Sequence, residues 1–219
     1  FQYLNAKKEK GVYLGANAAL GRRGIRMKFF PENPILVYRP FHLNERNYLY
    51  LADRGRIYGD VRLFDDQGTG IHFYTNREDT IADQEMTVEL SRIDLKQFKK
   101  VLPYLPDVEG WLGGSLHYVD SEGQMMLSAD MNLDNFVYEK SPLGNWTMSG
   151  AYLPGDNNAH HVDGFITYND QEIIYMNGVY QADETGQENI TGELELQHFP
   201  LRVINPFIPE KMVGFTGDI

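Results

Sequence analysis

The sequence predicts an all-β protein, built as a long antiparallel meander of strands with one or two short helices. Three observations support this fold class. Apolar and polar residues alternate with a period of two along most of the chain, as in strands that cover one face. Polar turn sequences follow one another at short intervals. The 219 residues include 14 Tyr, 12 Phe and 21 Gly, residue types that favour strands and turns.

The clearest strand lies in the middle of the chain, where five apolar residues alternate with more polar ones. The apolar set is Met125, Leu127, Ala129, Met131 and Leu133. We expect these five side chains to form one buried or covered face, because antiparallel strands commonly bury one side and expose the other. Residues 57–64, 86–91 and 190–196 alternate in the same way, and Leu194 and Leu196 lie on the apolar side of the last of these.

Further strands are expected wherever weaker alternation lies between turn sequences. They are predicted at residues 11–20, 24–30, 34–39, 48–53, 69–75, 111–119, 146–152, 162–168 and 172–180. Polar turns such as 65–68 and 120–123 separate most of them. About a dozen strands joined by short turns describe an antiparallel meander.

Two segments are predicted to be helical. The first spans residues 94–102, where Asp94 is a good N-cap and the apolar side chains share one face that would lie on the sheet. The second spans residues 200–207, with Pro200 as a first-turn proline.

Each helical segment introduces the same short pattern. An aromatic residue, Leu or Ile, and Pro are followed by an acidic residue and then by Gly-aromatic-x-Gly. The two Gly-aromatic-x-Gly elements begin at Gly110 and Gly214, 104 positions apart. Self-similarity of this kind indicates an array of repeats. We therefore expect a β-repeat over 1–93, a second β-repeat over 94–199 that starts with the short helix, and the truncated start of a third over 200–219.

Composition excludes several classes of partner and chemistry. With 31 Asp and Glu against 20 Lys and Arg, the net charge is −11, which disfavours nucleic acid and electrostatic docking on anionic lipid. The absence of Cys excludes disulfides, thiol nucleophiles and Cys-ligated zinc. We expect no catalytic residues, no metal site and no cofactor, so the chain is not predicted to be an enzyme.

No 18-residue apolar run is present that could span a membrane as a helix. Because the sequence starts at Phe1 without Met and ends in an apolar segment, we expect a piece of a longer protein.

The segment at 199–218 carries a resemblance to a known family. It reads Phe-Pro-Leu-Arg-Val-Ile-Asn-Pro-Phe-Ile-Pro-Glu-Lys-Met-Val-Gly-Phe-Thr-Gly-Asp. This phrase resembles a recurrent segment of the TamB family, the translocation-and-assembly-module proteins related to the AsmA-like group, and is similar to Bacteroidetes-type members. Residues 102–107 with 110–114 form a looser copy, and 123–138 is also similar to the family's repeat. The resemblance covers residues 94–219 and little of 1–93.

The resemblance implies an architecture and a role. Members of this family have long β-sheets curled into an open trough with an apolar inner face, the so-called β-taco. The family also implies a periplasmic location in the cell envelope and a parent protein anchored in the inner membrane. Implied roles are lipid transport between membranes, or assembly of outer-membrane proteins together with a β-barrel partner. The matching segment is structural and transfers no catalytic residues.

The apolar strand faces raise the main functional question, because a sheet must cover its apolar face with a second sheet, a helix or a bound lipid. The residues alone leave a closed sandwich and an open trough as alternatives, and the resemblance favours the trough. The predicted groove lining, with lipid acyl chains as the expected partner, is Met125, Leu127, Ala129, Met131, Leu133, Leu194 and Leu196. Unpaired sheet edges also predict self-association through edge strands. The alternative function is a carbohydrate-binding or adhesin-like β-sandwich, favoured by the Tyr and Trp content, and a third is a hydrolase on a β scaffold.

Other conspicuous residues receive structural interpretations. His160 and His161 are adjacent and would face opposite sides of a strand, and residues 156–163 are interpreted as a solvated loop. The carboxylates lie mostly in turns and on polar strand faces, with no pair that spacing alone brings together for catalysis. Trp111 and Trp146 open strands next to glycines and are interpreted as packing residues.

Overall fold

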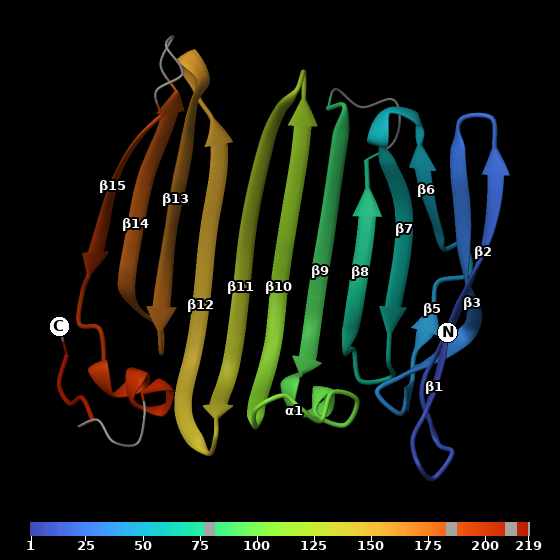
Figure 1. Ribbon diagram of the computed structural model, residues 1–219, viewed down its shortest axis with the longest axis horizontal. Helices are drawn as coiled ribbons and strands as arrows, with labels where there is room; N and C mark the ends of the chain where they lie inside the picture. The colour runs from blue at the N-terminus through green and yellow to red at the C-terminus, as the bar shows by residue number, and fades with distance from the viewer. Residues whose placement is uncertain (77–81, 183–187, 209–213, 219) are drawn as a thin grey trace.

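Fifteen strands form one antiparallel sheet (Figure 1). The computed structural model describes residues 1–76, 82–182, 188–208 and 214–218. The strands are β1 Gln2–Leu4, β2 Lys10–Gly21, β3 Gly24–Leu36, β4 Arg39–Pro40, β5 His42–Leu43, β6 Tyr48–Ala52, β7 Ile57–Phe64, β8 Gly70–Thr75, β9 Gln84–Asp94, β10 Val108–Ser121, β11 Gln124–Tyr138, β12 Ser141–Pro154, β13 Ala159–Tyr168, β14 Gln171–Ala182 and β15 Glu188–Leu196. Strands β4 and β5 lie off the main path and pair with β3 and β7.

In the part of the chain that the structure describes, helical structure is limited to short segments. They are the α-helix α1 Leu95–Phe98 and the 3₁₀ helices η1 Asp53–Gly55, η2 Asp156–Asn158 and η3 Leu201–Phe207. Figure 1 shows α1 and η3 at the same end of the strands, the lower end in that view. Among the described residues, no helix has both the length and the apolar character that crossing a membrane requires.

The sheet is a meander that stays open. Neighbours on the main path follow one another in sequence, and every pair is antiparallel, from β1–β2 through β14–β15. The path ends at β1 on one side and at β15 on the other. The predicted all-β meander with short helices is therefore confirmed. All fifteen strands belong to this one sheet, so the described residues do not form the stacked pair of sheets that the sandwich alternative requires.

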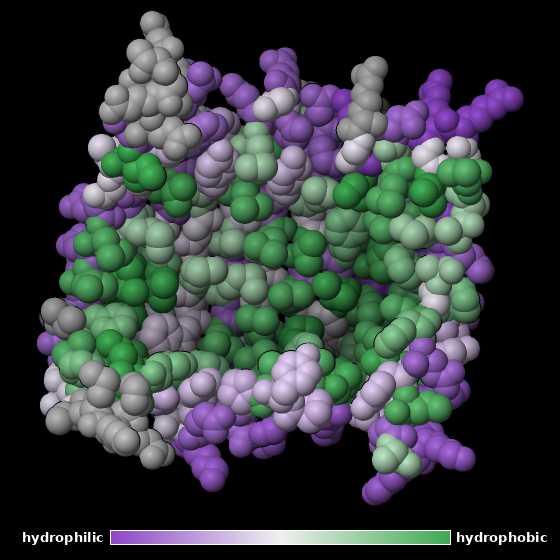
Figure 2. Space-filling view, in the orientation of Figure 1, coloured by the Kyte–Doolittle hydropathy of each residue, from purple (hydrophilic) through white to green (hydrophobic). Residues whose placement is uncertain are grey.

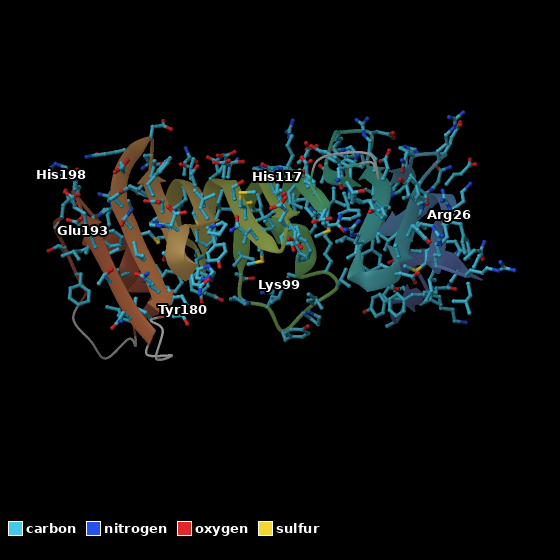
Figure 3. All side chains as sticks on the ribbon, turned by 90° about the horizontal axis from the view of Figure 1, so that it is seen from above. Arg26, Lys99, His117, Tyr180, Glu193 and His198 are labelled. Carbon is cyan, nitrogen blue, oxygen red and sulfur yellow. The ribbon has the colours of Figure 1, made fainter. Side chains whose placement is uncertain are left out.

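The sheet is curved. Seen from above in Figure 3, both ends bend toward the side on which Lys99 lies, while His117 lies on the opposite side. We call the side that carries α1 the concave face and the side that carries His117 the convex face. The most enclosed apolar cluster lies near the N-terminal end of the sheet, where Phe41, Leu43 and Leu63 are buried.

Several element boundaries differ from the sequence predictions. The strands expected at 24–30 and 34–39 are largely one long strand, β3. Its pairing with β2 is interrupted by a register shift after Phe30 and resumes at Ile35 and Leu36, and a turn comes only at Val37 and Tyr38. Asp94 does cap the first helix, where its carboxylate accepts a hydrogen bond from the Lys96 amide at 3.1 Å.

Both helices are smaller or tighter than expected. The helix predicted over 94–102 ends at Phe98, and single turns follow it, with the Val101 and Leu102 amides both donating to the Phe98 carbonyl. The segment at 200–207 is a 3₁₀ helix, and Pro200 stands before its first residue rather than in its first turn. Strand β9 continues to Asp94 without a break, so the expected repeat boundary at 93/94 falls at the end of a strand within one sheet.

Candidate functional site

Strand register places apolar residues in transverse rows on the concave face. Directly opposite residues of an antiparallel pair point to the same side of the sheet. One row, traced through successive partners, is Leu63, Ile71, Leu90, Gly114, Met131, Met148, Ile166, Ile174 and Leu196. The adjacent row is Val61, Phe73, Val88, Leu116, Ala129, Gly150, Gly164, Met176 and Leu194. Eighteen positions from nine strands thus form one continuous surface without a charged residue.

This surface remains accessible over much of its extent. Figure 2 shows hydrophobic side chains gathered over the middle of the face, with hydrophilic ones along the upper and lower margins. Leu116 is 39 % exposed, Met148 43 % and Leu194 66 %. A contiguous exposed apolar patch on a folded domain marks a site of interaction rather than ordinary surface. The concave face is therefore the candidate functional site.

The convex face has the opposite character. Its residues pair through polar contacts between strands: Asn177 donates to Asp163 at 2.5 Å, and His117 Nδ1 lies 2.9 Å from Thr87 Oγ1. The Tyr74 hydroxyl donates to Glu89 at 3.0 Å, and this bond, with burial, raises the pKa of Tyr74. The two faces therefore differ as expected for a sheet with one wet side.

Helix η3 folds back over the concave face and partly covers an apolar cavity of about 460 Å³. The ring of Phe207 lies 4.6 Å from that of Tyr138, measured between centroids, and Arg202 reaches the Tyr168 hydroxyl at 3.4 Å. The cavity is lined by Leu112, Met131, Asn132, Leu133, Phe136, Leu143, Trp146, Thr147, Met148, Ile166, Phe199, Val203, Ile204 and Phe207. Cavities of several hundred Å³ with apolar walls are typical of small-molecule sites.

The one indole in this cavity has its polar group satisfied. Trp146 Nε1 donates to the Leu143 carbonyl at 2.7 Å. The ring thus contributes apolar surface and no free hydrogen-bond donor. A ligand in this position would gain from hydrocarbon contact and shape, and would find little polar recognition.

A smaller cavity, of about 150 Å³, lies beside α1. Leu63, Ile71, Ile93 and Phe98 contribute to its walls. Ion pairs hold α1 and the following loop to the start of β10, between Lys96 and Glu109 at 2.6 Å and between Lys99 and Asp107. These contacts raise the pKa of Lys96 and lower that of Asp107. Both helices therefore partly cover the concave face at the same end of the strands.

All the residues predicted to line a groove share the concave face. Met131 and Leu133 line the cavity beneath η3. Ala129 and Leu194 belong to one transverse row and Leu196 to the other. Met125 and Leu127 lie on the same face, farther toward the end opposite the helices.

One part of that prediction is wrong. Met125 and Leu127 were expected to be buried or covered, and they are 43 % and 41 % exposed. The reason is geometric, since α1 and η3 lie only at the lower end of the strands and leave these two residues open.

Sequence reasoning missed several members of the concave face. Leu116, Met148 and Ile166 lie in predicted strands, and Leu116 and Met148 each have a polar residue on either side. Alternation of this kind indicates which side chains of one strand share a face. Only the pairing register of the strands shows that these residues lie in the same transverse rows as Ala129 and Met131 of β11. Val203 and Phe207 were assigned to a helix, and the sequence carries no signal that this helix returns to β11 and β12.

The adjacent histidines lie in a strand and not in the expected solvated loop. His160 and His161 belong to β13, because the chain has already entered the sheet at Ala159. The His160 ring stacks on Tyr152 with centroids 5.6 Å apart, and its Nδ1 lies 2.6 Å from the Tyr152 hydroxyl. Within the described ranges no cluster of three or more His, Asp or Glu side chains is arranged to hold a metal ion.

No protein-family model, curated protein or solved structure matches this chain.

Proposed function

We propose that this chain is part of a cell-envelope protein whose concave face holds lipid acyl chains and serves as an apolar conduit or scaffold. The observation that carries the proposal is the uninterrupted apolar surface across nine strands, much of it exposed. A soluble protein does not keep such a surface open without a partner for it. The resemblance of residues 94–219 to TamB-family repeats agrees with this role. It further suggests a periplasmic location, a parent protein anchored in the inner membrane and a β-barrel partner in the outer membrane.

Hydrocarbon chains suit this surface energetically. Burying a methylene contributes about 0.8 kcal/mol, so an acyl chain of ordinary length gains on the order of 10 kcal/mol before ordering costs remove much of it. The rows contain no charged residue, so the headgroup is not selected there. Binding should therefore be weak, tolerant of different headgroups and insensitive to salt.

The shape of the site fits a chain-like ligand. The rows run across the strands from β7 to β15, and the cavity beneath η3 continues from them at Met131 and Met148. An extended hydrocarbon can lie along a row and place one end under η3. A compact sugar would find few of the polar partners that carbohydrate recognition needs.

Photo-crosslinking tests the proposal. A benzophenone amino acid is introduced at Leu127 or Met148 on the concave face, and at Ser128 as a control on the neighbouring position of β11 that points to the convex face. The folded variants are irradiated with phosphatidylglycerol or phosphatidylethanolamine vesicles, and adducts are measured by mass spectrometry. We expect adducts with both lipids at Leu127 and Met148 and few at Ser128. Equal yields at all three positions, or none at any, would contradict the proposal.

A further inference from the structure

Two tyrosines flank Leu127 on the concave face. Tyr118 in β10 and Tyr152 in β12 are both direct partners of Leu127, which lies between them in β11. Directly opposite residues point to the same side of the sheet, so all three share the concave face. Both tyrosines lie near the C-terminal ends of their strands, and Figure 1 shows that β10 and β12 run away from α1 and η3. The two tyrosines therefore lie at the end of the concave face that neither helix covers.

A histidine and a third tyrosine continue this group across β13 and β14. His160 and Tyr180 are direct partners, and His160 lies two positions from Val162, the partner of Tyr152, so alternation places it on the same face. Figure 3 shows Tyr180 on the concave side, as Lys99 is. The ring centroids of Tyr152 and His160 are 5.6 Å apart, and those of His160 and Tyr180 are 5.7 Å apart. We call the group formed by Tyr118, Tyr152, His160 and Tyr180 the aromatic belt.

The aromatic belt offers hydrogen-bonding groups that the apolar rows lack. The Tyr152 hydroxyl lies 2.6 Å from His160 Nδ1. A hydroxyl and a neutral imidazole together carry two polar hydrogens, and this contact uses one, so in either tautomer one hydrogen remains for a ligand. β10, β12, β13 and β14 each pair with a strand on both sides, so the belt lies in the interior of the sheet.

The charges next to the belt favour an uncharged ligand group. Asp120, two positions beyond Tyr118, lies on the same face, and its Oδ1 is buried with no hydrogen-bond partner in the part of the chain that the structure describes. Arg56 lines the same hollow, but an ion pair with Asp83 holds it. A phosphate here would meet an unpaired carboxylate oxygen. Ester carbonyl oxygens carry no charge and accept hydrogen bonds from hydroxyl and imidazole donors.

The opposite end of the same strands has a different character. It holds the apolar cavity beneath η3, and its aromatic polar groups already have partners within the protein. Trp146 Nε1 donates to the Leu143 carbonyl, and the Tyr168 hydroxyl accepts from Arg202 at 3.4 Å. Along β10 to β14, the concave face thus has hydrogen-bonding groups at one end and a hydrocarbon-lined cavity at the other.

The distance between these two ends matches one acyl chain. In β12, Tyr152 lies four positions from Met148 and six from Trp146, and both of these residues line the cavity. At about 3.3 Å per residue, the two spans are about 13 and about 20 Å. One acyl chain fills about half of the roughly 30 Å hydrocarbon core of a bilayer, or about 15 Å. A chain laid along β12 therefore reaches from the belt into the cavity.

We propose that the aromatic belt binds the ester region of a glycerolipid while the methyl end of an acyl chain occupies the cavity beneath η3, so that the bound lipid has one direction along the strands. This inference rests on the proposed function and adds a polar subsite and an orientation to it. Tyrosine suits the position because its ring is apolar and its hydroxyl polar, as in the aromatic belts at membrane–water interfaces. Esters are common to phosphatidylglycerol and phosphatidylethanolamine, so the belt agrees with tolerance of different headgroups.

Directional photolabelling tests the orientation. Two phosphatidylethanolamine probes carry a photoreactive diazirine in one acyl chain, either next to the ester or next to the terminal methyl. Each probe is added in vesicles to the wild-type chain and irradiated, and the adducts are localised by fragmentation mass spectrometry. We expect the ester-end probe to label mainly Tyr118 and Tyr152, and the methyl-end probe to label mainly Met148, Ile166 and Phe207.

The labelling pattern separates this inference from the function on which it rests. If both probes label the two sets of residues equally, the orientation is refuted and the proposed function stands. If neither probe gives adducts on the concave face, the proposed function is refuted, and this inference with it.

Removal of hydroxyl groups tests the polar subsite. The double variant Tyr118→Phe/Tyr152→Phe should bind ester-linked phosphatidylethanolamine about two- to tenfold more weakly than the wild type, the effect of one hydrogen bond. Its affinity for the ether-linked analogue, which lacks the carbonyl oxygens, should equal that of the wild type. Tryptophan fluorescence reports binding, because Trp146 lines the cavity. The matched control is Tyr175→Phe in β14, which lies between the concave-side residues Ile174 and Met176 and so points to the convex face.

The comparison of the two lipids distinguishes recognition from a structural effect. We expect Tyr175→Phe to bind both lipids as the wild type does. An equal loss of affinity for the ester and ether lipids in the double variant would mean that the hydroxyls do not contact the ester, and would refute the subsite. Unchanged affinity for the ester lipid, with native strand content by circular dichroism, would refute it as well.

Discussion

The exposure of the concave face can be tested by comparing two leucines that belong to neighbouring strands. Leu143 in β12 is 4 % exposed and lines the cavity beneath η3. Leu127 in β11 is 41 % exposed and lies on the open part of the concave face. Replacing each with Ala removes the same atoms, so any difference in the free energy of unfolding reports the surroundings.

The expected magnitudes follow from the exposed fractions. Truncating a fully buried Leu to Ala removes three carbons, or about 2.4 kcal/mol at about 0.8 kcal/mol each. For Leu143 the enlarged cavity adds to this, so we expect a loss of about 3–4 kcal/mol. For Leu127 roughly three fifths of the side chain is hidden and no enclosed cavity forms, so we expect about 1.4 kcal/mol.

Urea denaturation followed by circular dichroism measures both values, provided that the dependence on urea is the same for the two variants. A Leu127→Ala loss as large as that of Leu143→Ala would refute the open concave face, because it would mean that Leu127 is enclosed in solution. Addition of a ligand for the concave face at about 100 times its Kd should stabilise the wild type by about 2.7 kcal/mol, and Leu127→Ala by less.

Three further predictions concern the elements that shape the site. Gly114 has φ +130°, and a Cβ there would lie 2.1 Å from the Asp130 carbonyl oxygen, so Gly114→Ala should cost about 3 kcal/mol of unfolding free energy in urea titrations. Gly123→Ala is the control, because a Cβ there meets open space and only the positive φ opposes it; equal costs would contradict the steric reason. Asp65 accepts hydrogen bonds from the Gln67 and Thr69 amides, both at 2.9 Å, and forms an ion pair with Arg39 at 2.7 Å. Asp65→Ala should therefore lower the stability by about 2–3 kcal/mol. Asp65→Asn retains the hydrogen bonds of the turn and should lose less stability in thermal melts. The hydrogen bond from Lys99, together with its charge, lowers the pKa of Asp107 in the folded protein. The pair therefore stabilises the fold at pH values above the pKa of Asp in the unfolded chain. This stabilisation is lost as the pH falls through the lowered pKa of the folded protein. In Lys99→Gln the carboxyl should titrate at higher pH by NMR, and an unchanged titration would show that the pair does not form in solution.

The sequence alone was sufficient to identify most of the long strands and the apolar side of the most regular ones. Alternation is a local property, because the pleat sends successive side chains to opposite faces whatever the neighbouring strand is. The run from Met125 to Leu133 therefore belongs to one face in the sequence and in the structure alike. The cap at Asp94 was also predictable, because an N-cap depends only on the first turn of its own helix.

Features that depend on several strands could not be predicted in this way. The transverse rows require the register of nine strands, and bulges such as the shift between Leu112 and Gly114 change that register by amounts that no local pattern reports. The return of η3 to Trp146 and Phe136, and the resulting cavity, depend on contacts between residues some 60 positions apart.

The exposure of Leu127 and the separation of charge between the two ends of the sheet are tertiary properties for the same reason. The alternation at Leu127 indicates an apolar side chain on one face, but only the positions of α1 and η3 decide that this part of the face stays open. The charges of residues 1–30 and of the stretch after Lys140 can be counted in the sequence, whereas their separation to opposite ends follows from the meander. Period-two patterning thus determines which side chains of each strand share a face. The long-range pairing, twist and curvature of the sheet decide whether those side chains contact other residues or solvent.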